Sequence, residues 1–279
     1  MDESQFTPAK RGFFMVKTET YQPNVSSRAG DIHEDGKVMD DMYSNYYQRY
    51  THHGPQESRD VLARRAKNDF IAMQPGEWAL DLGAGRQLLS RQMVHDSKRE
   101  FKGKIATLDI ADLAQHQLLA RGSKRISHVR ANGAVLPFPD DAFNIAFSHM
   151  GLELMPEKTI AELARVLKPE GRAFINVLDA SIIEEKKSEE VKKRRRRFNR
   201  EDNNKKYWAY YGREGNIFLR PLPEIKSILE GNGFEVKTMK EVESRRDPYS
   251  WVEIDLVKKP AREVKALPRS AIIFSYQGK

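Results

Sequence analysis

A short apolar run that ends in an acidic residue and two glycines carries the clearest chemical signal in this 279-residue chain. The run reads WALDLGAGR and spans residues 78–86. The apolar residues around Asp81 are typical of a buried central strand of a parallel sheet. Gly83 and Gly85 allow the backbone to turn tightly and to approach a ligand, and apolar residues at helical spacing follow. The order of strand, glycine loop and helix indicates a nucleotide-cofactor site.

The glycine loop departs from two phosphate-binding patterns that occupy the same position in other proteins. The dinucleotide fingerprint carries a third glycine where the pyrophosphate meets the helix, and this chain has Leu88 there. The P-loop closes its turn with a lysine followed by Ser or Thr, and this chain lacks that pair. These departures favour a cofactor without phosphate.

With four further stretches, the glycine loop resembles the ordered motifs of the class I S-adenosylmethionine-dependent methyltransferases. The stretches are IATLDI at 105–110, NGAVLPFPDDAF at 132–143, NIAFS at 144–148 and ELARVLKPEGRAFI at 162–175. Five ordered motifs are far more specific than one glycine loop. The resemblance covers residues 56–258 and implies an α/β fold, a Rossmann-like seven-stranded, mostly parallel sheet with an antiparallel last strand.

The resemblance also implies a binding site for S-adenosylmethionine. Asp109 would bind the ribose hydroxyls, and Asn132 stands where many members carry an Asp that bonds the adenine amino group. The amide oxygen of Asn132 can accept the same bond. Gln87 stands where many members have a glycine, so its side chain would project toward the methionine part of the cofactor. The residues expected to bind the cofactor are Asp81, Gly83, Ala84, Gly85, Asp109, Ile110, Asn132, Gly133 and His149.

Methyl transfer from a sulfonium needs little beyond positioning, because holding donor and acceptor in contact and excluding water accelerate an in-line displacement. A base is needed only where the acceptor retains its proton. His149 follows the expected fourth strand and is the candidate base. The alternative, which we favour, is that His149 lines the cofactor or caps a turn. Glu153 is a weaker candidate, since its place at the start of the next helix indicates a structural role.

Residues 1–55 form a first addition to the expected domain, an arm followed by a helix. Methionines and tyrosines recur three and four residues apart over residues 38–50, which places them along one side of a helix. This stripe packs on the core or, by the resemblance, forms a lid over the cofactor. In the second interpretation the substrate pocket includes Tyr43, Tyr46 and Tyr47.

A second addition is the insertion at residues 181–220, which contains six consecutive basic residues at 192–197. Glutamates four residues before basic residues support an exposed, solvated helix, which is the interpretation we favour. Basic residues followed by aromatic ones also suit phosphates and bases, so a nucleic-acid surface over 192–206 is the alternative.

The same insertion has a third interpretation, because in the resembled family the segment after the fifth strand commonly covers the substrate pocket. An apolar pocket with few polar groups is the usual small-molecule site. Its candidate wall residues are Tyr207, Trp208 and Tyr211. The chain ends in a third addition, the tail at residues 259–279.

Composition excludes several classes of function. The absence of cysteine excludes disulfides, thiolate metal sites and methylation of a pyrimidine carbon through a covalent cysteine adduct. His52 and His53 are adjacent and lack the spacing of a helical metal pair, so no metal is expected. No apolar run reaches the length of a membrane span and no signal peptide is recognised, so we expect a soluble, cytoplasmic protein. The net charge of +8 is explained by solubility as well as by acidic partners.

Three functional hypotheses follow. The preferred one is methyl transfer to a small-molecule O or N acceptor in a lidded pocket. The second is methyl transfer to RNA or protein through the basic insertion. The third is a regulatory domain that binds the cofactor without catalysis, and the retained Asp81 and Asp109 argue against it.

Overall fold

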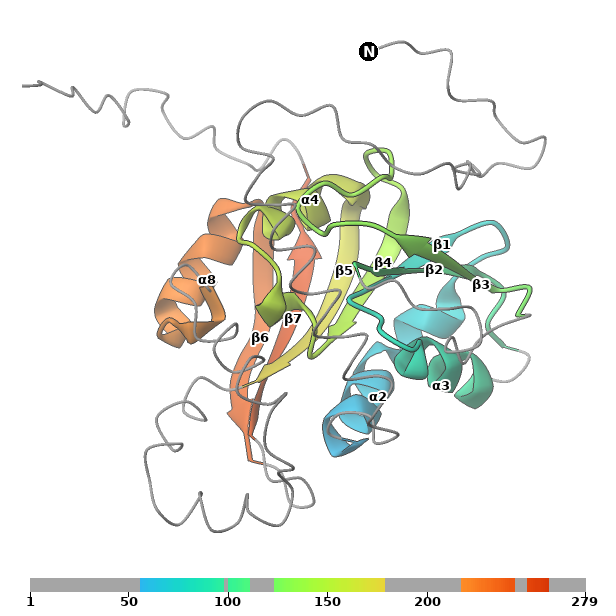
Figure 1. The fold of residues 1–279 in the computed structure, drawn as a ribbon, viewed down its shortest axis with the longest axis horizontal. Helices are drawn as coiled ribbons and strands as arrows, with labels where there is room; N and C mark the ends of the chain where they lie inside the picture. The colour runs from blue at the N-terminus through green and yellow to red at the C-terminus, as the bar shows by residue number, and fades with distance from the viewer. Residues whose placement is uncertain (1–55, 98–99, 111–122, 179–216, 244–249, 261–279) are drawn as a thin grey trace, which may run out of the picture.

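A seven-stranded sheet forms the centre of the molecule in the computed structural model, which describes residues 56–97, 100–110, 123–178, 217–243 and 250–260 (Figure 1). Its strand order is β3-β2-β1-β4-β5-β7-β6. The strands are β1 Trp78–Leu82, β2 Lys104–Asp109, β3 Ile126–Arg130, β4 Phe143–His149, β5 Leu167–Leu178, β6 Phe234–Val242 and β7 Trp251–Lys258. Only β7 runs antiparallel to its neighbours. The expected mostly parallel sheet with an antiparallel last strand is confirmed.

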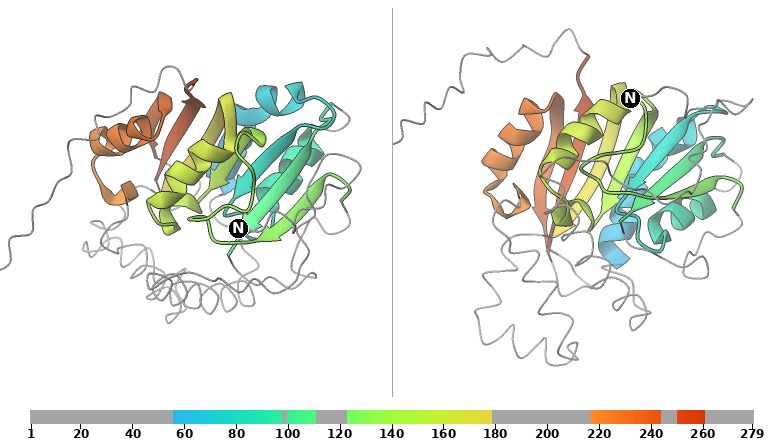
Figure 2. Two further views of the ribbon diagram at one scale, coloured as in Figure 1. Left: turned by 90° about the horizontal axis from the view of Figure 1, so that it is seen from above. Right: turned by 45° about the horizontal axis from the view of Figure 1, so that its top comes forward.

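Helices cover both faces of the sheet (Figure 2). On one face lie α2, Gln56–Ala72, and α3, Leu88–Asp96; on the other lie α4, Lys158–Val166, and α8, Leu222–Gly231. Because successive strand residues point to opposite faces, Ala79 packs in the core under α2 and α3, and Leu80 packs in the core under α4 and α8. Burial on both faces explains why β1 reads as a continuous apolar run. None of the described helices is long and apolar enough to cross a membrane.

Two details of the sheet differ from the sequence analysis. The edge strand β3 was not singled out, and each of its residues is half-buried or exposed. The expected K-P-x-G turn lies inside β5, which begins at Leu167 directly after α4. Glu170 there has a φ of 63°, and the pairing with β4 shifts at this point. The turn is therefore a bulge within the strand.

Helix α2 is joined to the sheet through a partly buried polar contact. The Arg65 guanidinium donates hydrogen bonds to Asn176 Oδ1 at 2.6 Å and to the Ile254 carbonyl at 2.9 Å, and it forms an ion pair with Asp255. The Asn176 amide in turn donates to the carbonyl of Ser58 at 2.8 Å. These bonds fix α2 against β5 and β7.

Candidate functional site

The sheet has a switch point between β1 and β4. From β1 the chain proceeds to β2 and β3 on one side, and from β4 it proceeds to β5 on the other. Ligands of open α/β sheets bind outside the carboxyl ends of the strands at such a point. All residues expected to bind the cofactor lie within or just beyond the carboxyl ends of β1, β2, β3 and β4.

The glycine loop between β1 and α3 turns as expected. Gly83 and Gly85 have φ values of 73° and 47°, which residues with a Cβ rarely adopt. The backbone N–H groups of Gly83 and Ala84 donate to the carbonyl of Leu108 at 2.9 and 3.0 Å. The Gly85 N–H donates to Asp109 Oδ2 at 2.7 Å. The end of β2 therefore holds the loop in place.

Asp81 joins β1 to the first turn of α3. Its carboxyl group is buried and accepts hydrogen bonds from both the hydroxyl and the backbone N–H of Ser90. Burial is the largest cause that raises the pKa of Asp81, the bonds from Ser90 lower it, and the neighbouring Asp109 carboxylate raises it, so that the pKa lies at about 7. These contacts give Asp81 a role in positioning the loop and the helix. Its direct contact with a cofactor stays a prediction.

Asp109 is the last residue of β2, and Asn132 follows the end of the neighbouring strand β3 by two residues. The carbonyl of Asp109 accepts a hydrogen bond from the N–H of Ala131 at 3.0 Å, which joins the two strand ends. Asn132 Oδ1 accepts from the N–H of Ala134 at 2.9 Å and so stabilises its own turn. Because an amide oxygen has two lone pairs, this bond is compatible with the adenine contact that the sequence predicts. Ile110 and Gly133 directly follow these strand ends.

The side chain of Gln87 does not lie where the sequence analysis expected. It turns into the interior, where it is 2% exposed, and its Nε2 donates to Thr107 Oγ1 at 2.7 Å. The φ of Gln87 is 66°, a left-handed conformation that glycine adopts without strain. The expectation that this side chain faces the methionine part of the cofactor is therefore corrected.

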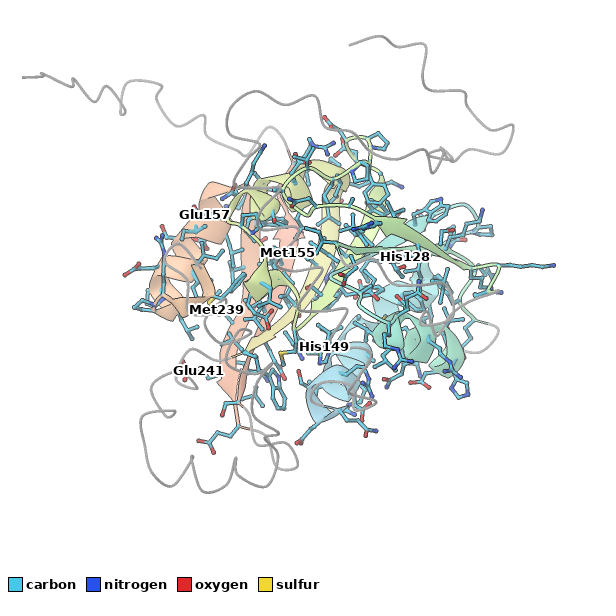
Figure 3. All side chains as sticks on the ribbon, in the orientation of Figure 1. His128, His149, Met155, Glu157, Met239 and Glu241 are labelled. Atoms are coloured by element: carbon cyan, nitrogen blue, oxygen red, sulfur yellow. The ribbon has the colours of Figure 1, made fainter. Side chains whose placement is uncertain are left out.

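His149 is the last residue of β4 and is half-buried, in register with Asn176 on β5. In Figure 3 it lies nearer the middle of the sheet than His128, which lies toward the β3 edge. This position suits both a residue that lines the cofactor and a base, and both roles stay predictions.

Met155 is a residue of this region that the sequence analysis did not select. A Cβ added to Gly133 would lie 2.7 Å from the Sδ atom of Met155, and a Cβ added to Gly83 would lie 3.0 Å from the Cε atom of Met155. The Met155 side chain therefore lies between the loop at Gly83 and the loop at Gly133. A single methionine after a strand carries no sequence signal for such a position, because the contact depends on how the loops pack.

Glu153 lies in the short helix η3, Leu152–Leu154, which follows β4. It is 1% exposed, and its Oε1 accepts a long hydrogen bond of 3.4 Å from the N–H of Leu178 at the end of β5. Burial raises its pKa to about 8. These contacts favour the structural role over that of a base facing a substrate.

The LPFPD loop is held by one arginine of α4. Arg165 donates to the carbonyls of Leu136 and Phe138 at 3.0 and 2.8 Å and to Asp140 Oδ1 at 2.8 Å. It also forms a two-point ion pair with Glu162, which accepts a bond from the N–H of Leu136. The hydrogen bond from Arg165 lowers the pKa of Glu162. This network joins the loop motif to the helix motif.

The expected substrate pocket falls on parts of the chain that are not described. Its six candidates, Tyr43, Tyr46, Tyr47, Tyr207, Trp208 and Tyr211, lie outside the described residues, and so does the basic segment 192–206. Within the described ranges no group of three or more His, Asp or Glu side chains could hold a metal ion. The pocket, the nucleic-acid surface and the domain boundaries stay predictions.

The chain matches known methyltransferases over its central part. Residues 80–175 match the family described as "Methyltransferase domain". A demethylmenaquinone methyltransferase of Clavibacter sepedonicus is 30% identical over 54% of this chain and 60% of its own length. A ubiquinone/menaquinone biosynthesis C-methyltransferase of Shewanella piezotolerans is 34% identical over 40% of this chain and 47% of its own length. The matches thus span about half the length of these relatives.

Two solved structures share the fold. One is a methyltransferase in complex with the Haloferax volcanii Trm112 methyltransferase activator, with a TM-score of 0.56 and 15% identity over 79% of this chain and 97% of that one. The other is the Burkholderia thailandensis 1,6-didemethyltoxoflavin-N1-methyltransferase with S-adenosylhomocysteine, with a TM-score of 0.52 and 18% identity over 86% and 94%. The strand order and these two structures show that the described residues have the fold of class I methyltransferases, and residues 80–175 are similar in sequence to a methyltransferase domain.

Proposed function

We propose that this chain transfers a methyl group from S-adenosylmethionine to a small molecule. The observation that carries the proposal is the junction of the glycine loop with β2, where Asp109 accepts the N–H of Gly85 at the switch point of the sheet. A carboxylate offers about four lone-pair sites, so Asp109 can hold the loop and still accept bonds from vicinal hydroxyls. The residues present therefore fit the cofactor.

Each residue at the crevice would have a separate part in the reaction. The bound cofactor supplies an electrophilic methyl group. Asp109 would hold its ribose, Asn132 would accept a bond from its adenine, and the loop at Gly83 and Gly85 would let the backbone approach it closely. His149, at the end of β4, would line the cofactor beside the switch point. Acceleration then comes mainly from holding the two reactants in line.

We propose an oxygen or nitrogen atom as the acceptor, in a pocket that the undescribed additions complete. A lone pair on either atom can attack directly, so the protein needs at most to remove a proton. The toxoflavin-type N1-methyltransferase with the same fold supports a small heterocyclic acceptor. The second candidate is a ring carbon of a quinol, favoured by the sequence match to a ubiquinone/menaquinone C-methyltransferase. A cytoplasmic location stays part of the proposal.

Replacing Asp109 with Ala is expected to weaken binding of S-adenosylmethionine by about 1 to 3 kcal/mol, because a charged hydrogen-bond acceptor is lost. Calorimetric titration with S-adenosylmethionine and with S-adenosylhomocysteine measures the change in binding free energy. Asp96→Ala, at an exposed aspartate at the end of α3, is the matched control and should bind as tightly as the wild type. Binding of NADH in place of S-adenosylmethionine by the wild-type chain would contradict the proposed function.

Replacing His149 with Ala is expected to weaken cofactor binding while turnover at saturating cofactor survives, because the residue is proposed to line the site. The acceptor for this assay is found first, by screening phenols, amines and quinols with labelled S-adenosylmethionine. If His149 is instead the base, turnover falls about a hundredfold to ten-thousandfold with affinity intact. Loss of a titration near neutrality from the pH profile of the variant would then accompany the lost turnover.

A further inference from the structure

The glycine loop ends at a residue whose backbone conformation is unusual for its type. Gln87 has a φ of 66° and a ψ of 28° and directly precedes α3. Its N–H donates to the carbonyl of Ala84 at 2.8 Å, which closes the loop, and its carbonyl accepts from the N–H of Arg91 at 2.9 Å, which opens the helix. The left-handed conformation is unfavourable for a residue with a side chain. Both the loop and the helix therefore depend on a conformation that needs support.

The side chain of Gln87 supplies that support. It is buried, and its amide donates to the hydroxyl of Thr107, which is also fully buried. A buried amide without a partner would destabilise the fold. The left-handed backbone of Gln87 places its amide beside Thr107, and the hydrogen bond to Thr107 in turn stabilises that backbone conformation. Glycine at this position would adopt the same φ freely but would contribute no such bond.

Three consecutive residues of β2 hold the loop at successive points. Thr107 accepts from the Gln87 side chain, the carbonyl of Leu108 accepts from the first two N–H groups of the loop, and Asp109 accepts from Gly85. The Leu108 bonds hold the start of the loop. The Gln87–Thr107 bond holds its end, where α3 begins.

We propose that Gln87 is a positioning residue, which through Thr107 holds the end of the glycine loop in the geometry that binds the cofactor. This inference rests on the proposed function for its effect on cofactor binding. A glycine at this position would adopt the left-handed conformation without strain. In this chain the Gln87–Thr107 hydrogen bond stabilises that conformation, and it also restricts the motion of the loop. A loop ordered before binding loses less conformational freedom when the ligand binds.

The pair is independent of the charge on the neighbouring histidine. Thr107 Oγ1 lies 3.1 Å from His128 Nδ1 and 3.2 Å from the carbonyl of Ser127. Burial lowers the pKa of His128, so the neutral ring can accept the Thr107 hydroxyl proton. A protonated ring would donate to Thr107 instead, and the hydroxyl would donate to Ser127. In both states Thr107 can still accept from Gln87.

A double-mutant cycle with Gln87→Ala and Thr107→Val tests the proposal. Each single variant is expected to weaken binding of S-adenosylhomocysteine about tenfold, the size of one buried hydrogen bond. The double variant is expected to weaken it about tenfold as well, since both changes break the same bond. Hydrogen exchange of the Ala84 and Gly85 amides, measured without any ligand, is expected to accelerate in all three variants, with exchange in α8 unchanged.

Gln92→Ala is the matched control. Gln92 is a half-buried glutamine on α3 whose side chain bonds Arg59 and Asp60, so its loss should leave both affinity and loop exchange unchanged. Gln87→Gly tests the proposal even if Gln87→Ala fails to fold. It removes the side chain and its hydrogen bond, and glycine adopts the same backbone conformation without strain. It is expected to fold like the wild type, to exchange faster in the loop and to bind S-adenosylhomocysteine more weakly than the wild type.

Three results would overturn the proposal. They are additive effects in the double variant, unchanged loop exchange in Gln87→Ala, and wild-type affinity together with wild-type loop exchange in Gln87→Gly. If the wild-type chain does not bind S-adenosylhomocysteine, the proposed function fails, and the exchange of the ligand-free loop still decides whether the pair holds it.

Discussion

The free energy of unfolding is expected to fall by several kcal/mol between about pH 5 and pH 8, because two buried carboxyl groups must ionise in that range. Burial raises the pKa of Glu153 to about 8 and that of Asp81 to about 7. In the unfolded chain both groups ionise near their ordinary values of 4.5 and 3.8. Between those values and the folded ones, the folded state keeps protons that the unfolded state has released. Stability present at low pH is therefore lost as the pH rises, by up to about 1.4 kcal/mol per pH unit for each group.

Urea denaturation at half-unit steps of pH measures this slope. Asp81→Asn and Glu153→Gln carry neutral side chains of similar shape, and each is expected to flatten the fall, with the double variant flattest. Glu157→Gln is the control for loss of a charge at a half-exposed position. The hydrogen bond from Arg165 lowers the pKa of Glu162. The contribution of Glu162 to the free energy of unfolding is therefore lost as the pH falls below the ordinary value of 4.5, outside the range from pH 5 to pH 8. A double variant that keeps the wild-type slope would contradict the explanation.

Replacing Arg165 with Ala is expected to lower the free energy of unfolding by about 2 to 4 kcal/mol. The guanidinium joins the carbonyls of the LPFPD loop to Glu162, and its removal leaves those carbonyls and a carboxylate without their donor. Arg165→Lys is expected to recover less than half of the loss, because an ammonium lacks the planar fork that serves several acceptors. Chemical denaturation of both variants measures the effect.

Arg220→Ala is the matched control for Arg165→Ala. Arg220 forms an exposed ion pair with Glu157 at 3.9 Å, and such pairs contribute about 0 to 1 kcal/mol. Equal losses in the two arginine variants would show that the loop network adds nothing beyond a surface ion pair. A cycle with Glu162→Gln is expected to show that the two residues are coupled.

The parts of the fold that are buried on both faces were predictable from the sequence. β1 and β2 read as apolar runs because helices cover both sides of them, and the glycine loop was recognisable because few residues other than glycine adopt its φ values. β3 was not recognised, because an edge strand with Ser127, His128 and Arg130 has neither an apolar run nor strict alternation.

The contacts that hold the site in place were harder to predict than its location. Asp81 was recognisable as the acid of a motif, but its bonds to Ser90 depend on where α3 begins. The position of the Gln87 side chain depends on a left-handed backbone and on Thr107, which is 20 residues away. Pairings of this kind arise when strands align in space, and no local pattern in the chain records them.

The contact between Gly83 and Gly151 constrains how this protein can change over evolutionary time. A Cβ on either residue would lie 3.0 Å from the Cα of the other, so the loops after β1 and β4 meet main chain to main chain. An alanine at either position would push apart two segments that paired strands hold together. A side chain is therefore disfavoured at both positions together, and the close spacing of the two loops depends on both glycines. A change of shape beside these loops is easier at a neighbour such as Met155, whose unbranched thioether adapts to different surroundings.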